Sequence, residues 1–497
     1  VPDLPTIDTS TEQDVAGGGY NHWATAGFFG RLNYNYKEKY LLEVNGRYDG
    51  TSRFMKDQRW NFFPSFSLGW NVARENFWKP LESVVNQFKL RGSWGELGNQ
   101  NTSNLYPFYE ILPVKSNSGN WLVNGGKTNT ADIPSLVSTL LTWERVRSFN
   151  VGFDFGAFSN RLTGSFDYFV RKTVDMVGPA PQLPLVLGIA PAIVNNADMK
   201  SYGFEIELSW RDRIGEVDYG VKFNLADAQQ KVVKYPNTTN AFSDWYAGKM
   251  SGEIWGYTSL GIAKTDEEMK EHLASLPNGG QNQLGNKWGA GDIMYADING
   301  DGKVDGGKGT LADPGDQRII GNSTPRYNFG LVLDASYKGF DVSIFFQGVG
   351  KRDYAPIVGT NGAVFWGAVN NIWQSMAMEE HFDYFRPEGH PMGANLNGYY
   401  PRPDFTSNKN HQVQTRYLQD ASYIRLKNLQ IGYTLPKQWI NKLHINRCRV
   451  YVSGDNLWTG TSLASMFDPE TLAAGDWGSG KTYPLSKVIS FGLNVNF

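Results

Sequence analysis

The chain has 497 residues, of which 40% are hydrophobic and 19% charged, and its 47 Lys and Arg against 49 Asp and Glu give a net charge of −2. This near balance provides no basic field for nucleic acid, and no apolar stretch reaches the roughly 20 residues of a membrane-spanning helix. The single cysteine, Cys448, excludes an intrachain disulfide and argues against a thiolate metal site. An excess of aromatic residues and 55 Gly favour strands and turns over helices.

Alternation of apolar and polar residues is the dominant pattern along the chain. It is clear in Tyr40–Tyr48 and Tyr202–Trp210, and clearest in Ile489–Phe497, where every second residue is Ile, Phe, Leu or Val and those between are Ser, Gly or Asn. Such alternation is typical of strands with one apolar and one polar face. In chain order, about thirteen strands are predicted, near 24–36, 39–50, 60–73, 87–95, 145–158, 162–171, 201–212, 217–228, 326–338, 340–349, 422–434, 447–456 and 487–497.

The predicted strands are long for a soluble protein. Most have ten or more residues, whereas soluble strands usually have about five or six. Ten tilted residues span about 25 Å, which is the height of the apolar band of an outer-membrane barrel. One strand is irregular, because the apolar positions of Tyr423–Tyr433 change phase between Leu426 and Leu429, and this predicts a β-bulge.

The connections between the strands alternate between short and long. Short links at 37–38, 159–161, 213–216 and 338–339, with medium links at 74–86 and 435–446, lie on one side, and long links at about 96–144, 172–200, 229–325, 350–421 and 457–486 on the other. We therefore predict an all-β fold, a transmembrane antiparallel β-barrel with short periplasmic turns and long extracellular loops. Phe497 would then end in the periplasm. Because single-chain bacterial barrels have an even number of strands, we expect further strands before residue 1.

One motif in the longest loop has the spacing of a calcium site. Asp297, Asn299, Asp301 and Asp305 occupy positions 1, 3, 5 and 9 of an EF-hand loop, with Gly302 at position 6 and the Lys303 carbonyl at position 7. Position 12 departs from the pattern because it is Lys308, so that Asp313 or Asp316 would supply the late ligand. The hypothesis is a structural Ca²⁺ in an extracellular loop, and the alternative is a solvated turn of Asp, Asn and Gly.

Catalytic motifs are lacking. The six histidines have no metal-binding spacing, and the sequence contains neither GxSxG nor a phosphate-binding GxxxxGK[ST]. We therefore expect no enzyme activity. Tryptophans in the long loops are candidates for contact with substrate or with a lid, because their rings stack on sugars and anchor protein partners, while local packing is the alternative. The candidates are Trp245, Trp366 and Trp373.

Several segments together resemble the SusC/RagA-type TonB-dependent outer-membrane transporters of Bacteroidota. The resemblance covers the chain from end to end and is specific only when the segments are taken together. They are Phe28–Glu43, Arg47–Phe54, Asn61–Trp70, Lys89–Gln100, Tyr295–Gly302, Ile320–Tyr327, Tyr423–Leu429 and the aromatic C-terminus.

The resemblance implies a 22-stranded barrel, of which this chain would be the C-terminal part with about thirteen strands. An N-terminal plug, which contacts TonB, would lie outside residues 1–497. A SusD-like surface lipoprotein would form a lid over the barrel, and two such pairs could associate as a dimer.

The function expected is TonB-dependent import across the bacterial outer membrane, with an oligosaccharide preferred over an oligopeptide as cargo. The alternatives are a secreted all-β glycan-binding protein or glycoside hydrolase that uses loop aromatics and a pair of carboxylates, and a passive porin. The polar inner faces of a wide barrel favour a conduit.

Overall fold

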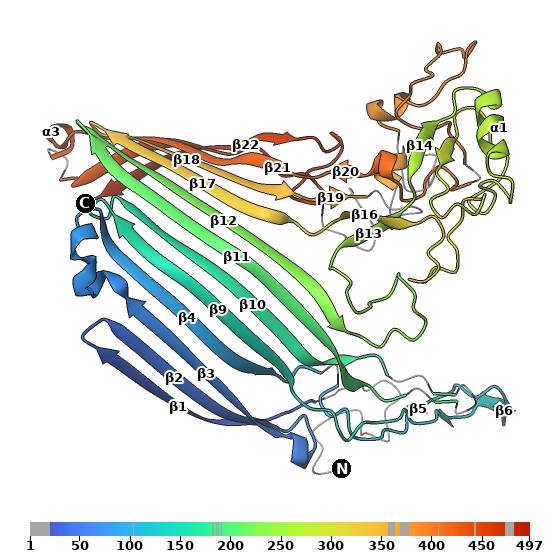
Figure 1. Ribbon diagram of the computed structural model, residues 1–497, viewed down its shortest axis with the longest axis horizontal. Helices are drawn as coiled ribbons and strands as arrows, with labels where there is room; N and C mark the ends of the chain where they lie inside the picture. The colour runs from blue at the N-terminus through green and yellow to red at the C-terminus, as the bar shows by residue number, and fades with distance from the viewer. Residues whose placement is uncertain are drawn as a thin grey trace.

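The computed structural model describes residues 20–102, 104–180, 183–184, 186, 188–189, 191–355, 363–367, 377–405, 407–441, 444–472 and 482–497. Its main feature is a thirteen-stranded antiparallel sheet in which each strand pairs with the next long strand along the chain (Figure 1). This confirms the predicted all-β architecture and strand number. The strands are β1 Thr25–Tyr36, β2 Tyr40–Thr51, β3 Trp60–Asn71, β4 Val85–Asn99, β9 Glu144–Ala157, β10 Leu162–Gly178, β11 Val194–Ile214, β12 Val217–Lys234, β17 Arg326–Tyr337, β18 Phe340–Lys351, β21 Tyr423–Thr434, β22 Arg447–Thr461 and β23 Val488–Asn496.

The sheet curves without closing, because no pairing joins β1 to β23 among the described residues. Short turns lie along one edge and long connections along the other, as the alternation of link lengths predicts (Figure 1). The turn between β17 and β18 consists of Lys338 and Gly339, whose φ angles of 45° and 90° are those of a two-residue hairpin turn that matches the twist of its strands.

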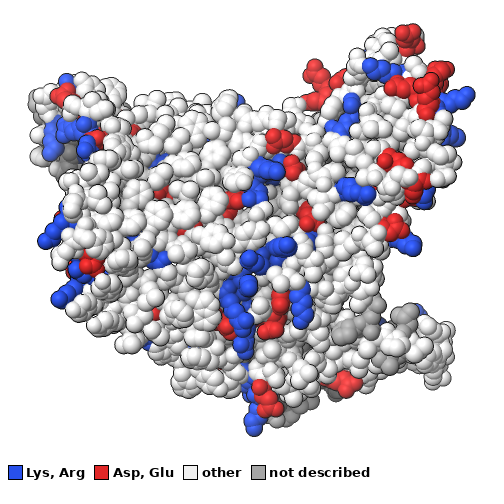
Figure 2. Space-filling view, viewed as in Figure 1, with Lys and Arg blue, Asp and Glu red and all other residues white. Residues whose placement is uncertain are grey.

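The outward face of the sheet is apolar. Direct cross-strand pairing places one aromatic or aliphatic residue after another across nine neighbouring strands. Figure 2 shows few charged atoms over the middle of the strands, as expected of a surface that contacts hydrocarbon. The row consists of Tyr36, Tyr40, Trp70, Leu90, Phe153, Phe166, Ile206, Leu225 and Phe329.

The opposite face is polar. The residues next in sequence to the apolar row pair with one another in the same way, so that Asp154, Ser165, Glu207 and Asn224 form a row across β9 to β12. On this face the Arg91 guanidinium binds Asp154 at 2.9 Å and Asp167 at 2.8 Å. A wall with hydrocarbon on one side and paired charges on the other is the wall of a barrel with a polar interior.

Two sequence expectations about the strands have different outcomes. The bulge is confirmed, since the pairing of β21 with both neighbours shifts at Lys427, between Leu426 and Asn428. The loop expected at 172–200 is much shorter, because β10 continues to Gly178 and β11 begins at Val194. The polar residues that ended the alternation, such as Lys172 and Lys200, lie on these strand extensions, where antiparallel pairing continues beyond the apolar band.

Small elements lie outside the main sheet. Among the described residues, no helix is both long and apolar enough to cross a membrane. The short strands are β5 Val114–Lys115, β6 Leu122–Val123, β7 Gly126–Lys127, β8 Thr130–Ala131, β13 Glu253–Gly256, β14 Ser259–Ile262, β15 Ile293–Tyr295, β16 Arg318–Asn322, β19 Asp353–Tyr354 and β20 Gln419–Asp420, and the α-helices are α1 Asp266–Ala274, α2 Ala363–Trp366 and α3 Lys437–Ile440.

Candidate functional site

Three long connections fold together into one compact body at the loop edge of the sheet, which we call the loop unit. It comprises the described residues of 235–325, 352–421 and 462–472, and it contains α1 and the strand pairs β13–β16, β14–β15 and β19–β20 (Figure 1). Backbone hydrogen bonds join the first two connections at Tyr257, whose N–H binds the carbonyl of Val413 at 2.8 Å. Its buried core draws on all three connections, with Tyr257, Ile293, Tyr295, Phe365, Phe385, Tyr417 and Phe467 among its members.

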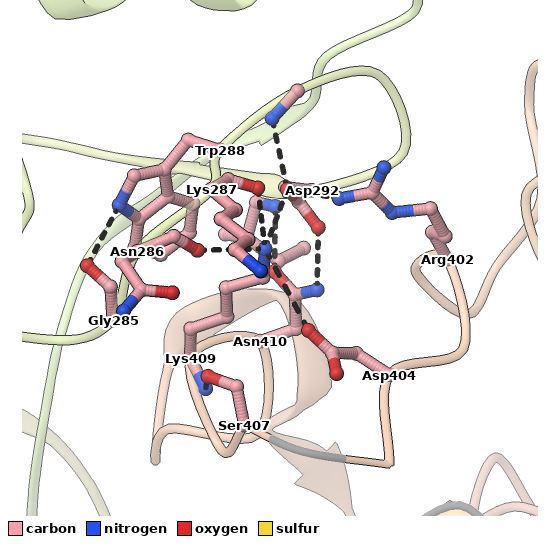
Figure 3. Close-up of polar contacts among 12 residues, drawn as sticks. Gly285, Asn286, Lys287, Trp288, Asp292, Arg402, Asp404, Ser407, Lys409 and Asn410 are labelled. Carbon is pink, nitrogen blue, oxygen red and sulfur yellow. Dashed lines mark hydrogen bonds and ion pairs between the residues drawn. The ribbon is translucent and has the colours of Figure 1, made fainter.

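A buried group of charges lies at the centre of the loop unit (Figure 3). The Asp292 carboxylate has no exposed surface, and Lys409 is only 1% exposed. Lys409 Nζ lies 2.9 Å from Asp292 Oδ2 and also donates to the carbonyls of Asn286 and Lys287. Arg402 Nη2 binds the same carboxylate oxygen at 2.7 Å, and Asn410 Nδ2 binds the other at 2.9 Å. These contacts tie two connections that are more than 100 residues apart in sequence.

The Asp-rich motif forms a tight turn on the surface of the loop unit. The Asp297 carboxylate accepts from the N–H groups of Gly300 and Gly302 at 2.6 and 2.8 Å. The buried Asp316 side chain binds the N–H groups of Ile298 and Asp305 at 2.7 and 2.8 Å, so it closes the turn from outside the motif.

Lys303 provides a side-chain cation at the same turn. Its Nζ lies 2.5 Å from Asp305 Oδ2, and this contact lowers the pKa of Asp305. Among the described residues, no three Asp, Glu, His or Cys side chains converge as a metal site. The structure thus brings the motif residues into one turn, while Asp305 is held by an ammonium group. Calcium binding there stays a prediction.

The three candidate tryptophans have different surroundings. Trp245 is 40% exposed at the outer end of β12, where Lys249 Nζ lies 5.7 Å from the centre of its ring. Trp366 is 3% exposed and belongs to the core of the loop unit, as the packing alternative predicts. Trp373 lies outside the described residues.

Trp366 also borders a pocket of about 280 Å³ in the loop unit. Its ring stacks on His411 with 4.4 Å between ring centres. Both Trp366 Nε1 and His411 Nδ1 are buried, and neither has a hydrogen-bond partner among the described residues. Sequence reasoning missed His411, because a lone histidine carries no signal of its burial.

The buried His411 makes the loop unit sensitive to acid. Burial lowers the pKa of His411 from 6.5 to about 4, against the weaker opposite effect of Asp404. Because the folded pKa lies below the unfolded value, the contribution to stability is present above pH 6.5 and is lost as the pH falls toward 4. We expect a loss of about 1.4 kcal/mol per pH unit within this window.

Hydrogen exchange of the full-length protein, corrected for the intrinsic pH dependence, would measure this loss. His411→Phe should reduce the acid sensitivity of the loop unit relative to the unmodified protein. An unchanged difference between pH 7 and pH 4.5 would assign the effect to groups other than His411.

The sequence matches a known protein family over most of its length. The profile of the family described as TonB dependent receptor-like, beta-barrel matches residues 3–457. The chain belongs to this family. As a member, it forms a wall of an outer-membrane β-barrel, and the family comprises receptors and transporters rather than enzymes.

Curated relatives align with this chain over nearly its whole length. TonB-dependent receptor P3 of Formosa agariphila is 30% identical over 94% of this chain and 45% of its own length. TonB-dependent receptor SusC of Bacteroides thetaiotaomicron is 24% identical over 95% of this chain and 43% of its own length. This TonB-dependent receptor chain therefore spans about half the length of the curated relatives it matches.

A solved structure shows the same fold. The RagAB peptide transporter superposes with a TM-score of 0.71 at 23% identity, over 96% of this chain and 48% of that one. These matches confirm the outer-membrane location and the resemblance to SusC and RagA.

Proposed function

We propose that the protein is an active importer that takes oligomeric nutrients across the outer membrane, driven by TonB. Membership of the TonB-dependent receptor barrel family over residues 3–457 carries this proposal. The structure adds a wall with an apolar outer face and a polar inner face that bears Arg91, Asp154 and Asp167. A water-soluble glycan-binding protein or glycosidase does not account for the wide apolar surface.

A SusD-like lipoprotein is the proposed lid, and the loop unit is the proposed surface beneath it. Two observations support this assignment. The matched relatives include SusC, and the matched fold includes that of RagAB, a peptide transporter. The loop unit has a core of its own and charges buried at its centre, so it offers a stable surface rather than a set of separate loops.

Oligosaccharides are the proposed cargo class, with oligopeptides as the second candidate. Trp245 supports this choice, because an exposed indole stacks readily on the face of a sugar ring. Lys249, whose Nζ lies near the Trp245 ring, also donates to the carbonyls of Phe242 and Asp244 at 2.8 Å. These contacts stabilise the loop that carries Trp245.

Uptake by cells that produce the full-length protein would test the proposal. Oligosaccharide uptake should be lost when TonB is deleted and when the lid lipoprotein is deleted. Uptake that persists without TonB would identify a porin. Uptake of oligopeptides alone would agree with the proposed importer function but would contradict oligosaccharides as the cargo.

Trp245→Ala should reduce oligosaccharide uptake at low substrate concentration by about tenfold or less, since a ring stacked on one aromatic side chain contributes about 1 kcal/mol. Trp439→Ala is the matched control, because Trp439 is also exposed but lies in α3 at the edge with the short turns. Equal uptake by the two variants would show that Trp245 does not contact the substrate during import.

We also propose a structural Ca²⁺ at the turn of Asp297, Asn299, Asp301 and Asp305, with the Lys303 carbonyl as a further ligand. Removing calcium with a chelator should then make the loop unit more sensitive to proteolysis, and Asp301→Ala should have the same effect in calcium buffer. Glu267→Ala, at an exposed acid on α1, is the control. Equal protection with and without chelator would contradict the proposal.

A further inference from the structure

Four basic residues lie side by side across four neighbouring strands. Lys172 of β10 pairs directly with Arg147 of β9 on one side and with Lys200 of β11 on the other, and Lys200 pairs with Lys231 of β12. Residues that pair directly in antiparallel strands have Cβ atoms about 5 Å apart and point to the same face. We call Arg147, Lys172, Lys200 and Lys231 the basic row.

The basic row lies on the outward face of the barrel. Each of its first three members is two residues from an apolar residue of that face, and those neighbours, Phe149, Val170 and Tyr202, pair with one another. Side chains two positions apart on a strand share a face. The row therefore continues the lipid-facing surface, one step closer to the long loops.

Its position marks the border of the apolar band. Figure 2 shows Lys and Arg atoms, with some Asp and Glu atoms beside them, where the strands approach the loops, next to a wide area with few charges. In a bilayer the polar headgroups begin directly beyond the hydrocarbon, so the phosphates of outer-leaflet lipids would lie next to the basic row.

Acidic residues do not neutralise most of this charge. Glu96 binds Arg147 at 2.8 Å and Arg145 at 3.3 Å, and Asp227 binds Arg326. Asp198, two residues before Lys200, accepts a hydrogen bond from the N–H of Asp175. Within the described part of the chain, no ion pair joins Lys172, Lys200 or Lys231 to an acid.

Like charges directly opposite each other in a sheet are destabilising. An anion from outside the chain would therefore stabilise these three neighbouring ammonium groups, which have no counter-charge among the described residues. The surface beside the row carries few charged atoms (Figure 2), as expected of a surface that contacts lipid. This setting distinguishes the basic row from ordinary solvated lysines.

We propose that the basic row binds the phosphate groups of a phosphorylated lipid in the outer leaflet. Ammonium groups on directly paired residues, whose Cβ atoms are about 5 Å apart, can bind phosphate oxygens together, and Lys binds phosphate as a point charge. The adjacent apolar surface around Val170 and Tyr202 would receive the acyl chains. The proposal concerns the lipid boundary of the barrel and does not depend on the cargo.

The test uses the full-length protein in detergent and phosphorylated lipid A as the probe, with bound lipid counted by native mass spectrometry. The variant Lys172→Gln/Lys200→Gln/Lys231→Gln should lose at least tenfold in lipid A affinity. The matched control Lys89→Gln/Arg171→Gln/Lys222→Gln removes three cations from the inner face and should retain it. Lys172→Arg/Lys200→Arg/Lys231→Arg should also retain it, and the change in gel mobility on boiling would show that each variant is folded.

Three further arms identify the ligand. Dephosphorylated lipid A should bind at least tenfold more weakly, and 1 M salt should weaken binding of the phosphorylated form, because it reduces the Debye length to about 3 Å. Inorganic phosphate alone should not reproduce the affinity. Equal binding by the triple Gln variant, or equal binding of dephosphorylated lipid, would overturn the proposal, as would loss of an acidic partner protein from the triple Gln variant with lipid binding intact.

Discussion

Replacing Lys409 by Met is expected to destabilise the loop unit by about 3–5 kcal/mol, because it leaves the Asp292 carboxylate buried with part of its counter-charge removed. Both side chains are almost fully inaccessible, and Lys409 Nζ lies 2.9 Å from Asp292 Oδ2. Because Arg402 still binds the same carboxylate in this variant, we expect a loss of stability near the lower end of this range. The strands of the sheet should be unaffected, since none contributes to this group.

Hydrogen exchange resolved by peptide would measure the effect in the full-length protein. Amides of the loop unit should exchange faster while those of β9 to β12 keep their protection. Lys264→Met, at an exposed lysine of the same unit, is the matched control. Adding Asp292→Asn to Lys409→Met should recover part of the loss, because the uncompensated charge is then removed. Loss without any such recovery would assign the effect to the cation–π contact of Lys409 Nζ, which lies 5.0 Å from the centre of the Trp288 ring.

Leu225→Arg should destabilise the assembled barrel by about 2–4 kcal/mol, the cost of a cation near the middle of the lipid-facing surface. Leu225 pairs with Ile206 on one side and Phe329 on the other, so the new guanidinium would be surrounded by apolar side chains and hydrocarbon. Fewer correctly assembled barrels should result.

The preceding residue, Asn224, provides the matched control because it points to the polar face and pairs with Glu207. Asn224→Arg introduces the same group one position away and should have little effect. Denaturant titration of the full-length protein in vesicles would compare the two variants. Similar losses for both would contradict the assignment of the two faces.

Much of the candidate site depended on contacts that no local pattern contains. The Asp297–Asp305 turn was identifiable because its spacing is local, and Asp316, which closes it, was one of two acids expected near its end. The burial of Trp366 against His411 was not identifiable, since the two residues come from separate parts of a long connection and lie together only within the folded core. Asp292 and Lys409 gave no signal for the same reason.

The sequence by itself determined the strands, their number, the face that each presents to lipid, the turns and the bulge at Lys427. Alternation is a local property of each strand, and few polar residues are tolerated on a face that contacts hydrocarbon. The pattern of each strand therefore indicates which of its faces contacts lipid. Only the tertiary structure decided how far β10 and β11 extend, which connections share a core and which lysines become neighbours. Those features follow from strand register and from packing between distant segments, where a shift of one residue would exchange the faces and separate Lys172 from Lys200.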